Sequence, residues 1–136
     1  MNKNIILVTG GAGFIGSRLI EYLIKIKIKE KIISLDNYSS GTKQNHHKDK
    51  RVTYLKGETA NINKILFKFR KKVDCLFHFG EFARIYQSFL KMNECIESNS
   101  VGTNAVFNFC LKHNIKLIYS ATSASLGNKG NDKNLS

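Results

Sequence analysis

The sequence predicts an α/β domain built on a doubly wound parallel sheet. Short apolar runs alternate with longer segments whose apolar residues recur every three or four positions, as strands alternate with helices. The first run, Ile5–Val8, ends in a glycine-rich turn, and a second run ends in the acidic residue Asp36. Both endings are typical of strands that meet at a ligand-binding edge. We therefore expect strand order 3-2-1-4-5, with helices on both faces.

Composition narrows the class of protein. The chain has 136 residues, enough for one core, and it holds no apolar run that could span a bilayer and no signal peptide, so we expect a cytoplasmic enzyme. Cys75, Cys95 and Cys110 have neither metal-type nor redox-pair spacing, which predicts free thiols in a reducing compartment. The net charge of +12 comes mostly from dispersed lysines, so no specific nucleic acid is expected as a partner.

The glycine-rich turn after the first strand is the strongest local signal. Gly10 allows a tight turn, Gly13 leaves room for a pyrophosphate, and Gly16 lets the following helix pack against its strand. The free N–H groups and the positive end of that helix attract phosphate. Asp36 follows the turn by roughly twenty residues, where a carboxylate accepts ribose hydroxyls and repels a 2′-phosphate. The pattern predicts a dinucleotide site that prefers NAD to NADP.

Periodicity predicts the remaining elements of the first half. The first helix should turn six apolar residues inward: Phe14, Ile15, Leu19, Ile20, Leu23 and Ile24. A helix end and loop should lead to the second strand, Lys31–Asp36. Residues 38–50 are polar and predict a loop, whose His46 and His47 have no further ligands nearby, so no metal site is expected. Val52–Leu55 is the expected third strand.

The second half continues the alternation. Asn61 is expected to cap a helix that reaches Lys72, with an inward face of Ile62, Ile65, Leu66 and Phe69. Val73–Phe79 is the expected fourth strand, in which His78 is interpreted as a core residue rather than a catalytic one. A long helix over Asn93–Asn114 should bury Cys95, Val106, Phe107, Cys110 and Leu111, before a fifth strand over Ile115–Ser120.

Five segments taken in order carry a resemblance to a known family: Thr9–Gly16, Leu35–Gly41, Phe77–Gly80, Asn99–Thr103 and Ile118–Ser123. Together they resemble the NAD-dependent epimerase/dehydratase family, the extended branch of the short-chain dehydrogenases typified by UDP-glucose 4-epimerase. The match is collinear and runs from residue 4 to residue 127. It implies a Rossmann-type NAD(P)-binding domain over residues 1–127, followed by a polar tail at residues 128–136.

The resemblance implies a set of residues that would hold NAD: Gly10, Gly11, Gly13, Phe14, Ile15, Gly16, Asp36, Asn37, Glu58, Thr59, Phe79, Gly80 and Asn99. Glu58 and Thr59 depart from the Gly-Asp-Ile that relatives usually carry here. After Gly80 the family often has small residues, whereas this chain has bulkier and charged ones. Arg84 could therefore contact a substrate phosphate or pair with Glu81.

Thr122 stands where the family places its catalytic serine or threonine. Dehydratases of the family follow that residue with Asp and Glu, but Ser123 and Ala124 occupy those positions here, which favours epimerisation. The family's Tyr-x-x-x-Lys pair is absent, because none of the 5 tyrosines has lysine four residues later. Loss of such a general base typically costs about a hundred- to ten-thousandfold in rate.

The predicted function is thus the NAD-binding part of an epimerase for a UDP- or dNDP-sugar, truncated before the substrate lobe and inactive alone. A fragment or a frameshifted copy would explain the missing pair, and the full-length form is expected to be a homodimer. Two alternatives remain: a non-catalytic module that binds NAD or a partner chain, and a fragment of a nucleotide-sugar dehydratase or reductase.

Overall fold

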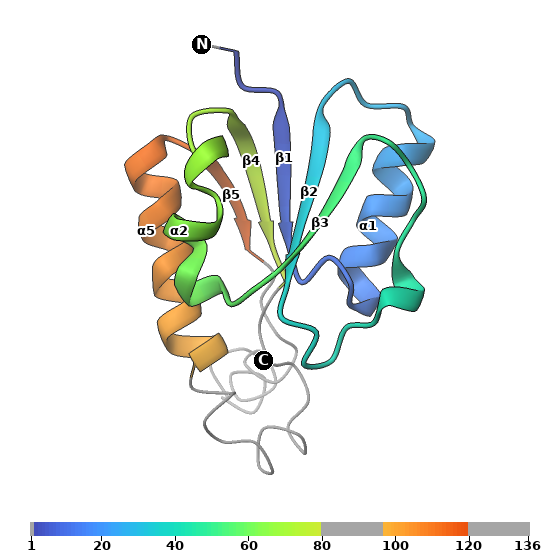
Figure 1. The fold of residues 1–136 in the computed structure, drawn as a ribbon. Helices are drawn as coiled ribbons and strands as arrows, with labels where there is room; N and C mark the ends of the chain where they lie inside the picture. Colours follow the sequence, from blue (N-terminus) through green and yellow to red (C-terminus); the bar gives the residue numbers. More distant parts are fainter. Residues whose placement is uncertain (1, 80–96, 120–136) are drawn as a thin grey trace, which may run out of the picture.

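The computed structural model describes residues 2–79 and 97–119. These residues form a 5-stranded parallel sheet in the order β3-β2-β1-β4-β5, so the predicted order is confirmed. Helix α1 covers one face of the sheet, and α2 and α5 cover the other (Figure 1). No helix in these ranges is long and apolar enough to cross a membrane.

The strands are β1 (Ile5–Thr9), β2 (Lys31–Asp36), β3 (Val52–Lys56), β4 (Val73–His78) and β5 (Lys116–Tyr119). Lys31–Asp36 was predicted with these bounds, and the others differ from expectation by one or two residues at their ends. Thr9 pairs with Leu35 on β2 and with His78 on β4. The carboxyl ends of the three central strands therefore lie level, at the lower edge of the sheet in Figure 1.

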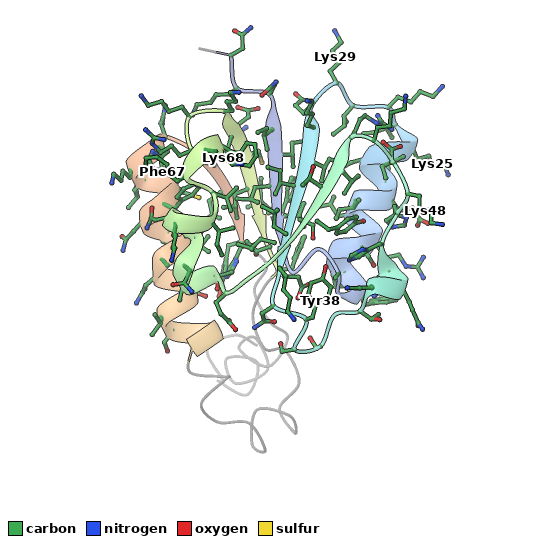
Figure 2. All side chains as sticks on the ribbon, viewed as in Figure 1. Lys25, Lys29, Tyr38, Lys48, Phe67 and Lys68 are labelled. Carbon is green, nitrogen blue, oxygen red and sulfur yellow. The ribbon has the colours of Figure 1, made fainter. Side chains whose placement is uncertain are left out.

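A separate apolar cluster fills each face of the sheet. Leu7, Ile33 and Leu76 face α2 and α5, whereas Val8 and Ile32 face α1. This alternation along β1 and β2 is the two-residue period of a strand buried on both sides. Charged side chains lie on the outside of the molecule instead. Figure 2 labels four lysines that are all exposed: Lys25, Lys29, Lys48 and Lys68.

Helix α1 (Phe14–Lys25) buries a narrower face than the sequence predicted. Ile20 and Leu23 are buried as expected, but Phe14 is 69% exposed and Ile15 is 55% exposed, so their prediction as inward residues is wrong. Both belong to the first turn, at the carboxyl edge of the sheet where the helix begins (Figure 1). Side chains there have no sheet surface to cover.

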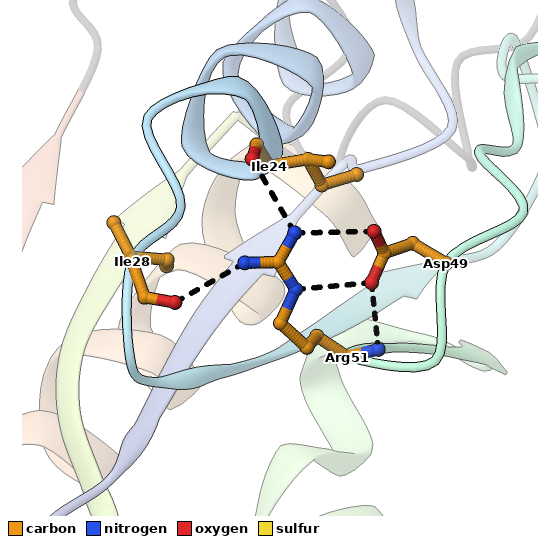
Figure 3. Close-up of polar contacts among 4 residues, drawn as sticks. All are labelled: Ile24, Ile28, Asp49 and Arg51. Carbon is orange, nitrogen blue, oxygen red and sulfur yellow. Dashed lines mark hydrogen bonds and ion pairs between the residues drawn. The ribbon is translucent and has the colours of Figure 1, made fainter.

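One arginine fastens the far end of α1 to the start of β3 (Figure 3). The Arg51 guanidinium donates hydrogen bonds to the carbonyl oxygens of Ile24 (3.3 Å) and Ile28 (3.2 Å). It also pairs with the Asp49 carboxylate at 3.1 Å. Ile24 belongs to the last turn of α1 and Ile28 to the loop after it, so Arg51 links the helix end, the loop and the start of β3.

The segment after β3 is not the continuous helix that was predicted from Asn61 to Lys72. It consists of a 3-10 turn η2 (Thr59–Asn61), a short α2 (Ile62–Ile65) and a second 3-10 turn η3 (Phe67–Phe69), and Asn61 makes no capping hydrogen bond. A 3-10 turn rises about 2.0 Å per residue against about 1.5 Å in an α-helix, so few residues cover more length. The predicted inward face is confirmed, since Ile62 and Leu66 are fully buried.

The predicted long helix is described from residue 97 onward. It consists of a π-helix η4 (Glu97–Gly102) and α5 (Thr103–His113). Val106 and Cys110 are buried as predicted, but the third buried residue is Phe109. Phe107 and Leu111 are 38% and 81% exposed, so the prediction that they face the core is wrong. Two apolar stripes overlap on this helix, and helical periodicity alone does not decide which one meets the sheet.

Candidate cofactor-binding site

Residues from three separate parts of the chain line one cleft at the carboxyl edge of the sheet. Its walls are Gly10, Gly13, Asp36, Asn37, Ser39, Ser40 and Phe79. An adjoining hollow is lined by Gly10, Leu35, Asp36, Asn37, Gly57 and Thr59. The position is the one at which open parallel sheets bind ligands, beside the point where the strand order reverses between β1 and its two neighbours.

The glycine turn has the geometry that the sequence predicted. Gly10 has a φ of 73°, a conformation that favours glycine, and its N–H donates to the Leu35 carbonyl at 2.8 Å. A Cβ on Gly16 would lie 2.2 Å from the Gly10 carbonyl oxygen, so Gly16 lets α1 pack against the turn itself. Among the described residues, a Cβ on Gly13 would meet that same oxygen alone, at 3.3 Å.

The structure explains why residue 11 is a glycine, which the sequence alone did not. A Cβ at this position would lie 2.1 Å from the Ser34 hydroxyl oxygen on β2. Ser34 is fully buried, and its hydroxyl has no hydrogen-bond partner among the described residues. The turn therefore sits directly on β2, which brings the start of α1 close to the acidic end of that strand.

The start of α1 is suited to hold an anion. Gly13 is the N-cap residue in an extended conformation, no side chain within residues 2–79 and 97–119 caps the helix, and its first turn contains no acidic residue. The first N–H groups of a helix have no partner inside it and carry a partial positive charge. These groups border the cleft at Gly13, where the open Cβ position leaves space for a phosphate.

Asp36 joins the turn to the loop after β2. One carboxylate oxygen accepts the Ala12 N–H at 2.9 Å, and the other accepts the Tyr38 N–H at 2.8 Å. The residue is 8% exposed and lines both the cleft and the adjoining hollow. Each carboxylate oxygen accepts more than one hydrogen bond, so Asp36 retains capacity for hydroxyl donors in the cleft.

Asn37, which lines the adjoining hollow, pairs with Glu58. The Asn37 side-chain amide donates to the Glu58 carboxylate at 3.0 Å, and its oxygen accepts the Ser39 N–H at 2.9 Å. Thr59 also lines this hollow and is 8% exposed. The unusual Glu58 thus has a partner within the predicted set, and both residues stay fixed beside Asp36.

A loop that the sequence left without a role supports the glycine turn. The Ala12 carbonyl accepts hydrogen bonds from the Thr42 N–H at 3.0 Å and from the Asn45 side chain at 2.8 Å. His47 lies with its Nε2 3.0 Å from the Ser17 carbonyl oxygen. No periodic pattern marks Thr42 or Asn45, because their contacts depend on the path of an irregular loop.

His46 packs within the same loop. Its ring stacks on Tyr54 with centroids 3.7 Å apart, and its Nε2 lies 2.7 Å from the Tyr38 hydroxyl. Burial and the nearby Lys43 lower the pKa of His46, so the neutral ring is favoured. Burial and the Asp36 charge raise the pKa of Tyr38, which keeps its hydroxyl protonated. Both histidines of the loop are therefore engaged with protein groups.

Some predicted site residues lie outside the described part of the chain. Gly80, Thr122 and the residues that distinguish the reaction, Ser123 and Ala124, are among them. The backbone of Asn99 lies in η4, and the contact of its side chain with a cofactor stays a prediction. The structure therefore brings together the glycine turn, Asp36, Asn37, Thr59 and Phe79, and leaves the catalytic position untested.

Comparison with solved structures supports the fold. The UDP-glucose 4-epimerase of Thermotoga maritima, solved with UDP-glucose, superposes with a TM-score of 0.75 and 28% identity over 87% of this chain and 38% of that one. The dTDP-glucose 4,6-dehydratase of Bacillus anthracis, solved in complex with NAD, superposes with a TM-score of 0.71 and 27% identity over 85% of this chain and 36% of that one.

Curated relatives have the same two activities in their names. The dTDP-D-glucose 4,6-dehydratase of Dictyostelium discoideum is 32% identical over 95% of this chain and 32% of its own length. The UDP-glucose 4-epimerase of Halalkalibacterium halodurans is 31% identical over 90% of this chain and 36% of its own length. The sequence model of the NAD dependent epimerase/dehydratase family matches residues 6–135. The chain, which spans roughly a third of the length of these relatives, belongs to that family.

Proposed function

We propose that this chain is the NAD-binding part of a nucleotide-sugar epimerase. The observation that carries the proposal is the position of Asp36, whose buried carboxylate holds the glycine turn through the Ala12 N–H and lines the cleft at the same time. The Asp36 carboxylate could accept hydrogen bonds from a ribose bound in the cleft. The N–H groups at the start of α1, beside Gly13 in the same cleft, could donate to a pyrophosphate. The family to which the chain belongs is NAD-dependent, in agreement with this geometry.

Different residues of the chain would bind different parts of the cofactor. The free N–H groups at the start of α1 would bind the pyrophosphate, and the open position beside Gly13 would let it approach. Asp36 would accept the adenosine ribose hydroxyls and repel a 2′-phosphate, which selects NAD over NADP. When bound at these residues, NAD would supply a hydride acceptor and donor for the sugar.

The choice of epimerisation rests on Thr122 and its neighbours. We assign Thr122 the role of hydrogen-bonding the reacting sugar hydroxyl, and Ala124 offers no acid or base for the elimination of water that a dehydratase performs. The substrate class is a UDP- or dNDP-sugar, as in the epimerase from Halalkalibacterium halodurans and the dehydratase from Dictyostelium discoideum. We further propose a homodimer for the full-length form.

A cytoplasmic location accompanies the proposal. Cys75 and Cys110 are free thiols, which suits a reducing compartment. Burial raises the pKa of Cys110 to about 11, so this thiol stays protonated and inert at neutral pH. Residues 1–127 would form the NAD-binding domain, and residues 128–136 the polar tail.

An activity assay separates binding from turnover. The purified chain is expected to bind NAD but to convert no UDP-galactose to UDP-glucose, because no tyrosine of the sequence has lysine four residues later. Conversion would be followed by separating the two sugar nucleotides after prolonged incubation with NAD, with a full-length epimerase as positive control. Conversion by the purified chain above the buffer blank would contradict the proposal.

A further inference from the structure

His78 is buried at the end of β4 with hydrogen-bond partners on both ring nitrogens. It is 1% exposed, its Nδ1 lies 2.6 Å from the Thr9 hydroxyl oxygen, and its Nε2 lies 3.2 Å from the Thr103 hydroxyl oxygen. The ring also stacks on Tyr119, with centroids 5.6 Å apart and planes 18° from parallel. We call Thr9, His78, Thr103 and Tyr119 the His78 cluster.

Each member of the His78 cluster stands at the end of an element that leads to a predicted site residue. Thr9 is the last residue of β1, directly before Gly10, and His78 is the last residue of β4, directly before Phe79. Thr103 is the first residue of α5 and follows the π-helix that contains Asn99. Tyr119 is the last residue of β5, three positions before Thr122 in the sequence. One imidazole therefore contacts residues next to three segments that hold predicted site residues and lies next to Phe79 itself.

The Thr9 hydroxyl links the His78 ring to the backbone that follows β4. Its oxygen accepts the Phe79 N–H at 3.0 Å and lies 2.6 Å from Nδ1 of the ring. Nε2 of the ring lies 3.2 Å from the Thr103 hydroxyl oxygen, so the imidazole bridges the end of β1 and the start of α5.

We propose that His78 is a positioning residue for the cofactor site, which sets the turn after β1, the end of β4 and the start of α5 relative to one another. The inference rests on the proposed NAD site. His78 is not itself a candidate catalytic residue, because it is 1% exposed and is not among the described residues that line the cleft or the hollow. It acts through Gly10, Phe79 and the helix that carries Asn99.

The test removes one hydroxyl at a time with little change of shape. Thr9→Val and Thr103→Val each delete one partner of the ring, and Thr9→Ser and Thr103→Ser restore the hydroxyl without the methyl group. Val73→Ala is the control, because Val73 is fully buried at the opposite end of β4. It lowers stability by leaving a cavity and touches no member of the His78 cluster. NAD affinity is measured by calorimetry at a temperature where every variant is folded.

Two readouts decide the outcome. Thr103→Val is expected to weaken NAD binding about fivefold, the equivalent of one lost hydrogen bond, and Thr9→Val is expected to weaken it more, because its hydroxyl also accepts the Phe79 N–H. Affinity should recover in the serine variants and should not change in Val73→Ala. Without NAD, Thr103→Val should speed amide hydrogen exchange of Gly10 and Phe79, which lie on other elements. Unchanged affinity in both valine variants would overturn the inference. If wild-type chain binds no NAD, the proposed function fails, and unchanged exchange in Thr103→Val then overturns the inference separately.

Discussion

Ser34 shows how single side chains fix the position of the glycine turn. Its hydroxyl is fully buried, faces Gly11, and has no hydrogen-bond partner among the described residues. An unsatisfied buried hydroxyl carries a desolvation cost of about 1 to 3 kcal/mol. A small side chain is needed here, since Gly11 leaves no room for a larger one, but the oxygen itself contributes nothing that the described structure reveals.

Ser34→Ala should therefore stabilise the protein. Removal of the buried hydroxyl is expected to raise the free energy of unfolding by about 1 kcal/mol, measured by urea denaturation, and to leave NAD affinity unchanged. Gly11→Ala is the matched comparison, because its Cβ would lie 2.1 Å from the same oxygen, and it should prevent folding. A clear loss of stability in Ser34→Ala would mean that the hydroxyl has a favourable partner.

Asp49 gives the stability of the chain a defined pH dependence. Hydrogen bonds from Arg51 lower the pKa of the Asp49 carboxyl (Figure 3). The ionised form is thus favoured in the folded state, so the stabilisation is present above the unfolded pKa of about 3.9 and is lost as pH falls through the lower folded pKa. Wild type should exceed Asp49→Asn in urea midpoint at pH 6, and the difference should shrink below about pH 4. A difference that stays constant over this range would contradict the ion pair.

Two glycines at the start of α1 serve different purposes. Gly16→Ala would press its Cβ to 2.2 Å from the Gly10 carbonyl oxygen, against backbone that has no room to move. Gly13→Ala meets that oxygen at 3.3 Å and projects its methyl group toward the cleft. The first change disturbs the packing of α1, whereas the second blocks the space proposed for the pyrophosphate.

Gly13→Ala should accordingly fold and bind NAD poorly, whereas Gly16→Ala should fail to fold. We expect a loss of NAD affinity of about tenfold or more in Gly13→Ala, which corresponds to about 1.4 kcal/mol. Circular dichroism reports the fold and calorimetry the affinity. Wild-type affinity in Gly13→Ala would show that no ligand approaches the turn at this position.

Prediction from the sequence succeeded for elements whose apolar pattern fits a single arrangement. The strand Lys31–Asp36 is apolar on both faces and ends at a polar loop, so its bounds were predictable. The apolar residues of α5 allow two overlapping faces, and only the packing against the sheet selects Phe109 over Phe107. The segment from Asn61 was predicted as one helix because its inward face repeats correctly, but 3-10 turns preserve that face while changing the path.

In the molecule as a whole, the site residues that belong to regular elements were predictable, and those whose contacts depend on a loop or on the strand order were not. The glycine turn and Asp36 were predictable because their spacing follows from a strand, a turn and a helix in fixed order. The contacts of Thr42 and Asn45 with Ala12 were not, since an irregular loop carries them. Nor does spacing in the sequence bring Thr9, His78 and Thr103 together, which only the strand order does.

The strand order also determines what the molecule as a whole can bind. With β1 at the centre, the glycine turn lies between the ends of β2 and β4, so Asp36 and Phe79 face each other across one cleft. The net charge of +12 adds a general attraction for anions but no geometry. In the function that we propose, recognition of NAD would come from the cleft, and the Asp36 carboxylate would account for a preference over NADP.

Calorimetric titration of the chain with NAD and with NADP measures this preference. We expect one NAD site per chain, at least about tenfold weaker binding of NADP, and loss of NAD binding in Asp36→Ala, since the carboxylate both lines the cleft and holds the turn. Thr53→Ala, on the exposed surface of β3, is the control and should bind as wild type does. Equal affinity for NAD and NADP, or wild-type affinity in Asp36→Ala, would show that Asp36 does not select the dinucleotide.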